Sequence, residues 1–108
     1  MYYTYMLRCQ DNTIYTGMTT DPIRRWQEHR AGGDKAAKYT RSHKAGQMIA
    51  LWQSDSRSLA AKLEYFIKTL TKAQKEALAV SGCLAAYADR LPIERYTSVP
   101  CPTASTDL

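Results

Sequence analysis

The N-terminal end of the chain limits the possible folds more than any other part. Residues 2–8 (YYTYMLR) and residues 13–19 (TIYTGMT) are rich in aromatic and β-branched residues, and Asp11-Asn12 stands between them. Aromatic and β-branched residues favour strands, whereas Asp and Asn favour tight turns. The two segments therefore predict an antiparallel β-hairpin.

A helix over residues 22–31 is expected directly after the hairpin. Asp21-Pro22 provides a favourable N-cap followed by proline at the first helical position, and Gly32-Gly33 ends the pattern. Trp26 lies on the face that we expect to pack. Arg25 and His29, four residues apart, lie on another face and need not pack.

The remainder of the chain predicts one more strand and further helices. Residues 34–46 are basic and lack an apolar period, so we expect an exposed loop, whereas the apolar run 48–53 has the length of a strand. Apolar residues then recur at helical spacing between Leu59 and Leu70. Thr71-x-x-Gln74 is a capping-box pattern that begins another helix, and residues 83–91 are expected to form a short last one.

These elements follow a ββαβαα order, which indicates an α+β domain with helices flanking a small, mostly antiparallel, three-stranded sheet. A length of 108 residues fits one domain. We place this domain at residues 1–91. Residues 92–108 are expected to form a C-terminal tail that is partly disordered, because the segment from Ser98 is rich in Pro, Ser and Thr.

The excess of positive charge favours a polyanionic partner. The chain has 15 Lys and Arg residues against 10 Asp and Glu, a net charge of +5. A solvated basic surface without such a partner is the alternative. Cys9, Cys83 and Cys101 indicate neither a disulfide framework nor a zinc site, so a reducing cytoplasm is expected. Neither a signal peptide nor a membrane-spanning run of ~18 apolar residues is recognisable.

Residues of the types used in phosphodiester hydrolysis occur along the chain. Tyr5 and Tyr15 project from adjacent strands, and if they share a sheet face their hydroxyls converge. Arg25 offers a planar donor for phosphate oxygens, His29 could bind a phosphate or hold a tyrosine, and Glu64 could supply the carboxylate for Mg²⁺. One tyrosine would activate the attacking water and the other would position it, and the residue types do not assign the two roles. A metal-bound water that loses its proton to bulk solvent is the alternative. Ordinary packing and surface roles are the alternative for each residue.

The same residues resemble the signature of the GIY-YIG nuclease family. Its two halves correspond to residues 3–5 (YTY), with Tyr and Thr in place of Gly and Ile, and residues 15–17 (YTG), with Thr in place of Ile. Arg25-x-x-x-His29 and Glu64 resemble the family's Arg-x-x-x-His motif and metal-binding carboxylate. The resemblance covers residues 2–79. It is closest to the short bacterial stand-alone (UPF0213-like) members, in which segments similar to IYTGMTTDPIRR and AKYTR recur.

The resemblance implies a Mg²⁺- or Mn²⁺-dependent endonuclease that hydrolyses phosphodiester bonds in DNA, structure-selective or non-specific, in DNA repair or processing. It implies catalytic roles for Tyr5, Tyr15, Arg25, His29 and Glu64, with Glu64 as the metal ligand. Other branches of the family carry an Asn after the metal-binding helix. This chain lacks that Asn, and the short stand-alone members lack it too. The alternative function is a catalytically weak nucleic-acid-binding module of the same fold.

A second group of residues is expected to bind the nucleic acid. Gly17 would let the substrate backbone or a neighbouring element approach its strand closely. Basic side chains between the first helix and the third strand would hold flanking phosphates, and the tyrosine among them could instead stack on an unpaired base. This group consists of Lys35, Lys38, Tyr39, Arg41 and Lys44. We expect a monomer that binds DNA, with substrate choice set by a protein partner or by the structure of the DNA.

Overall fold

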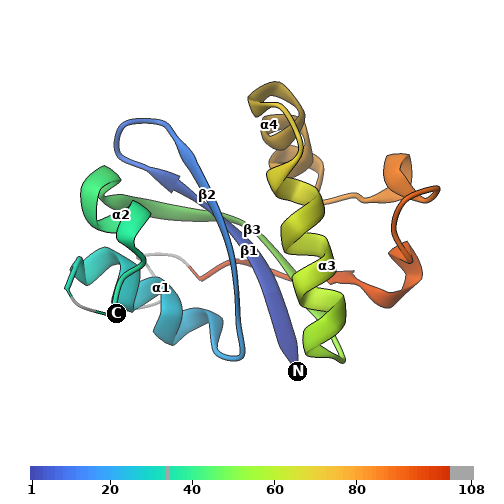
Figure 1. The fold of residues 1–108 in the computed structure, drawn as a ribbon, viewed down its shortest axis with the longest axis horizontal. Helices are drawn as coiled ribbons and strands as arrows, with labels where there is room; N and C mark the ends of the chain where they lie inside the picture. The colour runs from blue at the N-terminus through green and yellow to red at the C-terminus, as the bar shows by residue number, and fades with distance from the viewer. Residues whose placement is uncertain (34, 103–108) are drawn as a thin grey trace.

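The computed structural model describes residues 1–33 and 35–102. An antiparallel sheet separates two helical layers, with α1 (Pro22–Ala31) and α2 (Lys38–His43) on one side and α3 (Arg57–Lys68) and α4 (Lys72–Ser81) on the other (Figure 1). The expected α+β class is confirmed.

The hairpin at the N-terminus forms the middle and one edge of the sheet. β1 (Tyr2–Cys9) pairs with β2 (Ile14–Thr19) on one side and with β3 (Ala45–Ser54) on the other. The strand order is β2-β1-β3-β4, so β2 is an edge strand. The hairpin and the third strand were both expected from the sequence.

The helix α1 has the bounds that its flanking residues predict. The Asp21 side chain accepts a hydrogen bond of 3.2 Å from the backbone N–H of Arg24. Gly32 ends the helix with φ 70°, a left-handed conformation that glycine adopts without strain. Both ends of α1 are therefore set by local sequence.

The segment expected as a basic loop instead contains the short helix α2. Its N-cap residue, Ala37, makes no side-chain hydrogen bond. Thr40, at 0% exposed, is a buried polar residue of this helix rather than an apolar one. A helix that packs through a polar residue shows no apolar period, which is why the sequence pattern missed it.

The helices α3 and α4 both begin at a side-chain cap, and the one at α4 was expected from the sequence. The hydroxyl of Ser56 accepts from the N–H of Leu59 at 3.1 Å, and Thr71 and Gln74 form a complete capping box. The helix expected over residues 83–91 is reduced to a single 3₁₀ turn, η1 (Ala85–Tyr87).

The sheet has four strands rather than the expected three. After a 3₁₀ turn, η2 (Ile93–Arg95), the short strand β4 (Thr97–Ser98) pairs with β3. Tyr96 is buried and its hydroxyl donates to the carbonyl oxygen of Leu59 at 2.7 Å. Residues 92–102, which composition assigned to a tail, thus pack on the domain. Residues 103–108 lie outside the described part, and a domain boundary at residue 91 stays a prediction.

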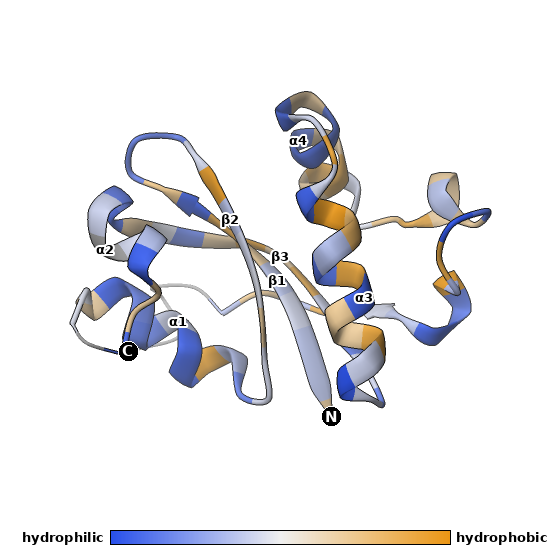
Figure 2. Cartoon of the chain, viewed as in Figure 1, coloured by the Kyte–Doolittle hydropathy of each residue, from blue (hydrophilic) through white to orange (hydrophobic). Residues whose placement is uncertain are grey.

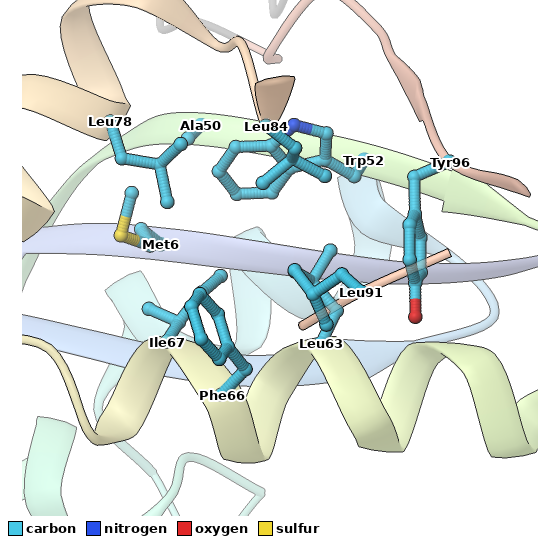
Figure 3. Close-up of a cluster of buried hydrophobic side chains, with 10 residues drawn as sticks. All are labelled: Met6, Ala50, Trp52, Leu63, Phe66, Ile67, Leu78, Leu84, Leu91 and Tyr96. Carbon is cyan, nitrogen blue, oxygen red and sulfur yellow. The ribbon is translucent and has the colours of Figure 1, made fainter. Parts of the chain in front are cut away.

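Each face of the sheet has its own core. The larger cluster joins the sheet to α3 and α4 (Figure 3) and consists of Met6, Ala50, Trp52, Leu63, Phe66, Ile67, Leu78, Leu84, Leu91 and Tyr96. The smaller cluster joins the sheet to α1 and consists of Tyr5, Leu7, Trp26, Ala45, Met48 and Leu51.

Hydropathy differs between the helices on the two sides. α3 alternates between hydrophobic and hydrophilic residues, whereas α1 is hydrophilic over most of its length (Figure 2). In the described part of the chain, no helix combines the length and apolar character needed to cross a membrane.

Candidate active site

Tyr5 and Tyr15 lie on the sheet face that α1 covers. In the β1–β2 register Tyr5 is opposite Gly17 and Tyr15 is opposite Leu7, so the two tyrosines are diagonal neighbours with ring centroids 6.3 Å apart. A Cβ at residue 17 would lie 2.5 Å from Oη of Tyr5 and 3.0 Å from Cε2 of Tyr15. The neighbours that approach the strand closely at Gly17 are therefore the two tyrosine rings.

His29 joins the tyrosine pair from α1. Contrary to the expectation that it need not pack, it is 0% exposed. Its Nε2 lies 2.8 Å from Oη of Tyr5, and its ring centroid is 5.3 Å from that of Tyr15. Burial, followed by the positive charge of Arg25, lowers the pKa of His29 to about 4. The imidazole is therefore neutral at pH 7.

The hydroxyl of Tyr5 stays protonated in this environment. Burial is the main cause that raises the pKa of Tyr5 above its ordinary value, and the charge of Tyr15 raises it further. The Arg25 guanidinium opposes these effects and the Glu64 carboxylate adds to them. A preformed phenolate at Tyr5 is therefore unfavourable.

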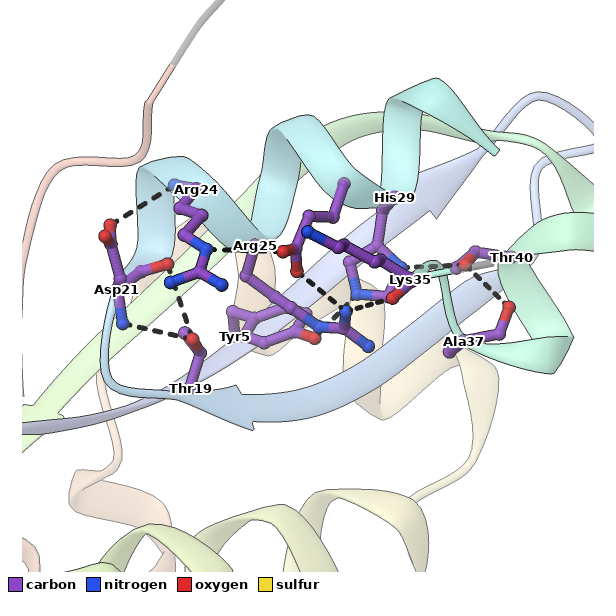
Figure 4. A network of polar contacts seen from close by, with 10 residues as sticks. Tyr5, Thr19, Asp21, Arg24, Arg25, His29, Lys35, Ala37 and Thr40 are labelled. Atoms are coloured by element: carbon purple, nitrogen blue, oxygen red, sulfur yellow. Dashed lines mark hydrogen bonds and ion pairs between the residues drawn. The ribbon is translucent and has the colours of Figure 1, made fainter. Parts of the chain in front are cut away.

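Arg25 is anchored beside Tyr5 (Figure 4). Its Nη1 donates to Oε1 of Glu28 at 3.0 Å and to the carbonyl oxygen of Lys35. The side chain remains 24% exposed and borders a polar hollow of about 210 Å³. The other residues that line this hollow are Thr19, Thr20, Asp21, Arg24 and Glu28. A fixed guanidinium with an open side suits the binding of a phosphate.

Glu64 lies in the helical layer on the opposite side of the sheet from Tyr5, and its side chain is hydrogen-bonded to Lys68. It belongs to α3, which is joined to β1 by a 2.9 Å hydrogen bond from the Thr4 hydroxyl to the carbonyl oxygen of Ala60. The Glu64 carboxylate accepts a hydrogen bond from Lys68 at 2.9 Å, and its side chain is 21% exposed. Its negative charge helps to raise the pKa of Tyr5. Glu64 thus acts on the tyrosine through its charge.

Two rings of α2 extend the aromatic cluster. Tyr39 stacks on Tyr15 at 5.7 Å and on His43 at 4.1 Å between ring centroids. His43 also pairs with Asp11, and hydrogen bonds from His43 and Thr13 lower the pKa of Asp11 to about 2. The ring of Tyr39 is therefore stacked on two other rings of the protein, and its stacking on an unpaired base stays a prediction.

The comparisons with known proteins place these residues in a family. The family model described as the GIY-YIG catalytic domain matches residues 1–77. The chain belongs to the GIY-YIG family. This confirms the resemblance seen in the sequence, and it places the domain in a nuclease superfamily, whose substrates are nucleic acids.

Similar relatives share the name UPF0213. UPF0213 protein FN1575 of Fusobacterium nucleatum is 48% identical over 75 residues, which cover 69% of this chain and 73% of the relative. UPF0213 protein VNG_2274C of Halobacterium salinarum is 47% identical over 78 residues, which cover 72% of this chain and 99% of the relative. The solution NMR structure of UPF0213 protein BH0048 from Bacillus halodurans, 38% identical, covers 84% of this chain and 97% of that chain with a TM-score of 0.48.

A divalent cation in this GIY-YIG domain would draw most of its ligands from outside the protein. No group of three or more His, Cys, Asp or Glu residues is placed to hold an ion within the described ranges. Mg²⁺ keeps several waters and is often bound by one or two carboxylates together with substrate phosphates. A single, partly exposed carboxylate such as Glu64 fits that way of binding.

The expected DNA-binding lysines lie on the surface of the GIY-YIG domain. Lys35, Lys38 and Lys44 are exposed. Lys35 is tied to the site through its backbone, because its carbonyl oxygen anchors Arg25. The side chain of Arg41 lies outside the described part of the chain.

Two residues of the site were not selected from the sequence. Glu28 holds Arg25, and its spacing of three residues on one helix is a signal that could have found it. The Oγ1 of Thr40 lies 2.7 Å from Nδ1 of His29 (Figure 4). No local pattern points to Thr40, because its partner is eleven residues away on another helix.

Proposed function

We propose that this GIY-YIG domain is a Mg²⁺- or Mn²⁺-dependent endonuclease that hydrolyses phosphodiester bonds in DNA, in DNA repair or processing. The observation that carries the proposal is one compact group on a single sheet face, in which Tyr5 is hydrogen-bonded to His29 beside the anchored Arg25. Hydrolysis needs an activated water and a counter-charge for the phosphate. These three side chains supply groups for both tasks.

Arg25 would bind the phosphate that is attacked. A planar guanidinium can donate to two phosphate oxygens at once, and negative charge gathers on those oxygens during attack. Its anchors, Glu28 and the Lys35 carbonyl, hold the group in place before the substrate arrives. Little reorganisation is then needed when the transition state forms.

Tyr5 and His29 would carry the proton of the attacking water. The raised pKa of Tyr5 opposes the formation of a free phenolate. No free phenolate is needed if the Tyr5 hydroxyl takes a proton from the water while it gives its own proton to Nε2 of His29. A bound phosphate offsets the charge of Arg25, which is one of the causes that lower the pKa of His29. His29 is thus a better base with substrate bound. Tyr15, half-buried beside both rings, would position the water or phosphate.

Glu64 would hold the divalent cation. Such an ion supplies positive charge to the phosphate and lowers the pKa of bound water. Lys68, which pairs with Glu64 and is 52% exposed, is free to turn towards solvent when the carboxylate is needed. The exposed lysines of residues 35–44 and the net charge of +5 would hold flanking phosphates. We propose a cytoplasmic monomer, with a partner protein or the shape of the DNA setting substrate choice.

The test is metal-dependent cleavage by the wild type and by Glu64→Gln on branched, single-stranded and duplex DNA. We expect Glu64→Gln to lose cleavage by about 100-fold or more while it stays folded, because a catalytic ion contributes several kcal/mol. Glu94→Gln, which makes the same change at an exposed residue, is the matched control and should cleave normally. Equal cleavage by Glu64→Gln contradicts the proposal. Salt-dependent DNA binding with no metal-dependent product indicates the binding module instead.

A further inference from the structure

A series of three hydrogen bonds runs from Tyr5 into α2 (Figure 4). Oη of Tyr5 is 2.8 Å from Nε2 of His29, and Nδ1 of His29 is 2.7 Å from Oγ1 of Thr40. Oγ1 of Thr40 is in turn 3.0 Å from the carbonyl oxygen of Ala37. Tyr5 is 1% exposed and His29 and Thr40 are 0% exposed, so these groups depend on one another as partners.

The last bond of the series sets the direction of the others. A carbonyl oxygen only accepts, so Thr40 donates its single hydroxyl proton to Ala37. The oxygen of Thr40 then accepts from Nδ1–H of His29. In a neutral imidazole one nitrogen donates and the other accepts, so Nε2 accepts the proton of Tyr5.

The opposite tautomer gives up one of the three hydrogen bonds and leaves the buried Tyr5 hydroxyl without its acceptor. If Nε2 carried the proton, His29 would donate to Tyr5 and the Thr40 hydroxyl would have to turn towards Nδ1. Ala37 would lose the hydrogen bond from Thr40, and the Tyr5 hydroxyl would lose His29 as its acceptor. Unpaired buried polar groups are unfavourable. The contacts of Thr40 therefore favour the tautomer with the proton on Nδ1.

We infer that Thr40 is a positioning residue that fixes the tautomer of His29 and so keeps Nε2 available to accept the proton of Tyr5. The nitrogen of a histidine that carries the proton is set by the hydrogen bond that the other nitrogen makes. Thr40 acts through His29 alone. Its importance for catalysis rests on the proposed function, whereas the tautomer itself is a property of the folded chain and can be measured without DNA.

The direct test is ¹⁵N NMR of the histidine rings in the whole chain at pH 7. The sequence has two histidines, so His43→Asn assigns the signals of His29. In the wild type we expect Nδ1 to be protonated and Nε2 to be unprotonated. Thr40→Val keeps the side-chain shape but removes the acceptor, and should shift the ring towards the Nε2–H form. Thr40→Ser, which keeps a hydroxyl, should restore the wild-type pattern.

Cleavage kinetics separate positioning from a structural role. We expect Thr40→Val to lower kcat about 10- to 100-fold with little change in KM, as is usual for a residue that orients a functional side chain, and Thr40→Ser to recover it. Protonated Nε2 in the wild type, or an unchanged ring in Thr40→Val, overturns the inference. The wild-type spectrum decides this even if Thr40→Val does not fold. If the NMR spectra show the expected tautomers but the protein cleaves no DNA, the inference about Thr40 and His29 holds and the proposed function is contradicted.

Discussion

Met6 and Tyr5 are neighbours on β1 that point to opposite faces of the sheet, and the contrast between them extends to the two faces as a whole. They are 0% and 1% exposed, respectively. Met6 packs among the apolar side chains beneath α3 and α4, whereas Tyr5 is hydrogen-bonded to His29 of α1. One face is thus buried by apolar contacts and the other partly by polar groups that depend on each other.

This difference separates stability from chemistry. Apolar burial contributes about 25 cal/mol per Å² and needs no specific partner. A buried polar group needs its partner, and losing that partner costs about 1–3 kcal/mol. The buried apolar side chains beneath α3 and α4 should therefore respond to substitution mainly in stability, whereas Glu64, on the partly exposed side of α3, belongs to the chemistry. The face beneath α1 should respond in activity and in the pH dependence of folding.

The largest effect is expected when the apolar face is damaged. Leu78 of α4 is 3% exposed within the larger cluster, and Leu78→Ala should lower the free energy of unfolding by about 2–5 kcal/mol because it leaves a cavity. Urea unfolding measures this loss. Cleavage per folded molecule should be unchanged. Val80→Ala on the same helix, where Val80 is 90% exposed, is the control and should have little effect. A loss of cleavage by folded Leu78→Ala would break the separation of the two faces.

The polar face should make folding sensitive to pH through His29. Its pKa is lowered to about 4 in the fold, against 6.5 ordinarily, so between these values the unfolded chain binds more protons than the folded one. The stability due to this group is complete above pH 6.5 and is lost as the pH falls to about 4. The full loss is about 3 kcal/mol.

Unfolding of the wild type and two variants in urea at several pH values checks this. His29→Gln, which has no titrating ring at that position, should lack the change between pH 6.5 and about 4. His43→Asn should retain it, because His29 is the buried histidine. A wild-type stability that is flat over this interval would show that His29 is not held in its neutral form.

The elements that sequence could predict are those with local signals. Asp21-Pro22 and Gly32 set both ends of α1, and Thr71 with Gln74 begins α4. In contrast, α2 and β4 depend on partners far along the chain. Thr40 is held by His29, and β4 by its pairing with β3. Such elements have weak patterns of their own, so a loop and a tail were expected in their place.

The candidate site divides in the same way. The family signature selected Tyr5, Tyr15, Arg25, His29 and Glu64 from their order in the chain, and this needed no geometry. The two hydrogen bonds of the buried His29 join it to Tyr5, 24 positions away, and to Thr40, 11 positions away. Both the lowered pKa of His29 and the role inferred for Thr40 follow from those contacts. Neither could be read from residue types and spacing.

Gly17 offers a way to disturb the polar face without removing a functional group. In Gly17→Ala the new Cβ would lie 2.5 Å from Oη and 2.7 Å from Cζ of Tyr5, which is buried and cannot swing aside. We expect a loss of about 1–3 kcal/mol in the free energy of unfolding, together with reduced cleavage because Tyr5 is displaced. Gly33→Ala, where a Cβ meets nothing within 4 Å, is the control for both measurements. Normal cleavage by Gly17→Ala would mean that the placement of Tyr5 is unimportant.

The smallest effect is expected from a matched pair of helix caps. Asp21 caps α1 through the N–H of Arg24, and Thr71 caps α4 through the N–H of Gln74, each at 3.2 Å. Replacement of either by Ala should cost about 1 kcal/mol, which thermal unfolding shows as a fall of about 4–8 °C.

The two cap variants should differ in cleavage, although they should be similar in stability. The first turn of α1 leads directly into Arg25, whose backbone N–H bonds to the carbonyl oxygen of Asp21 at 3.0 Å. Fraying of this turn in Asp21→Ala would loosen the guanidinium, so cleavage well below the melting temperature should fall several-fold. The described part of α4 carries no residue of the candidate site, so Thr71→Ala should cleave as the wild type does. If both variants lost activity equally, cleavage would depend on global stability rather than on the helix that positions Arg25.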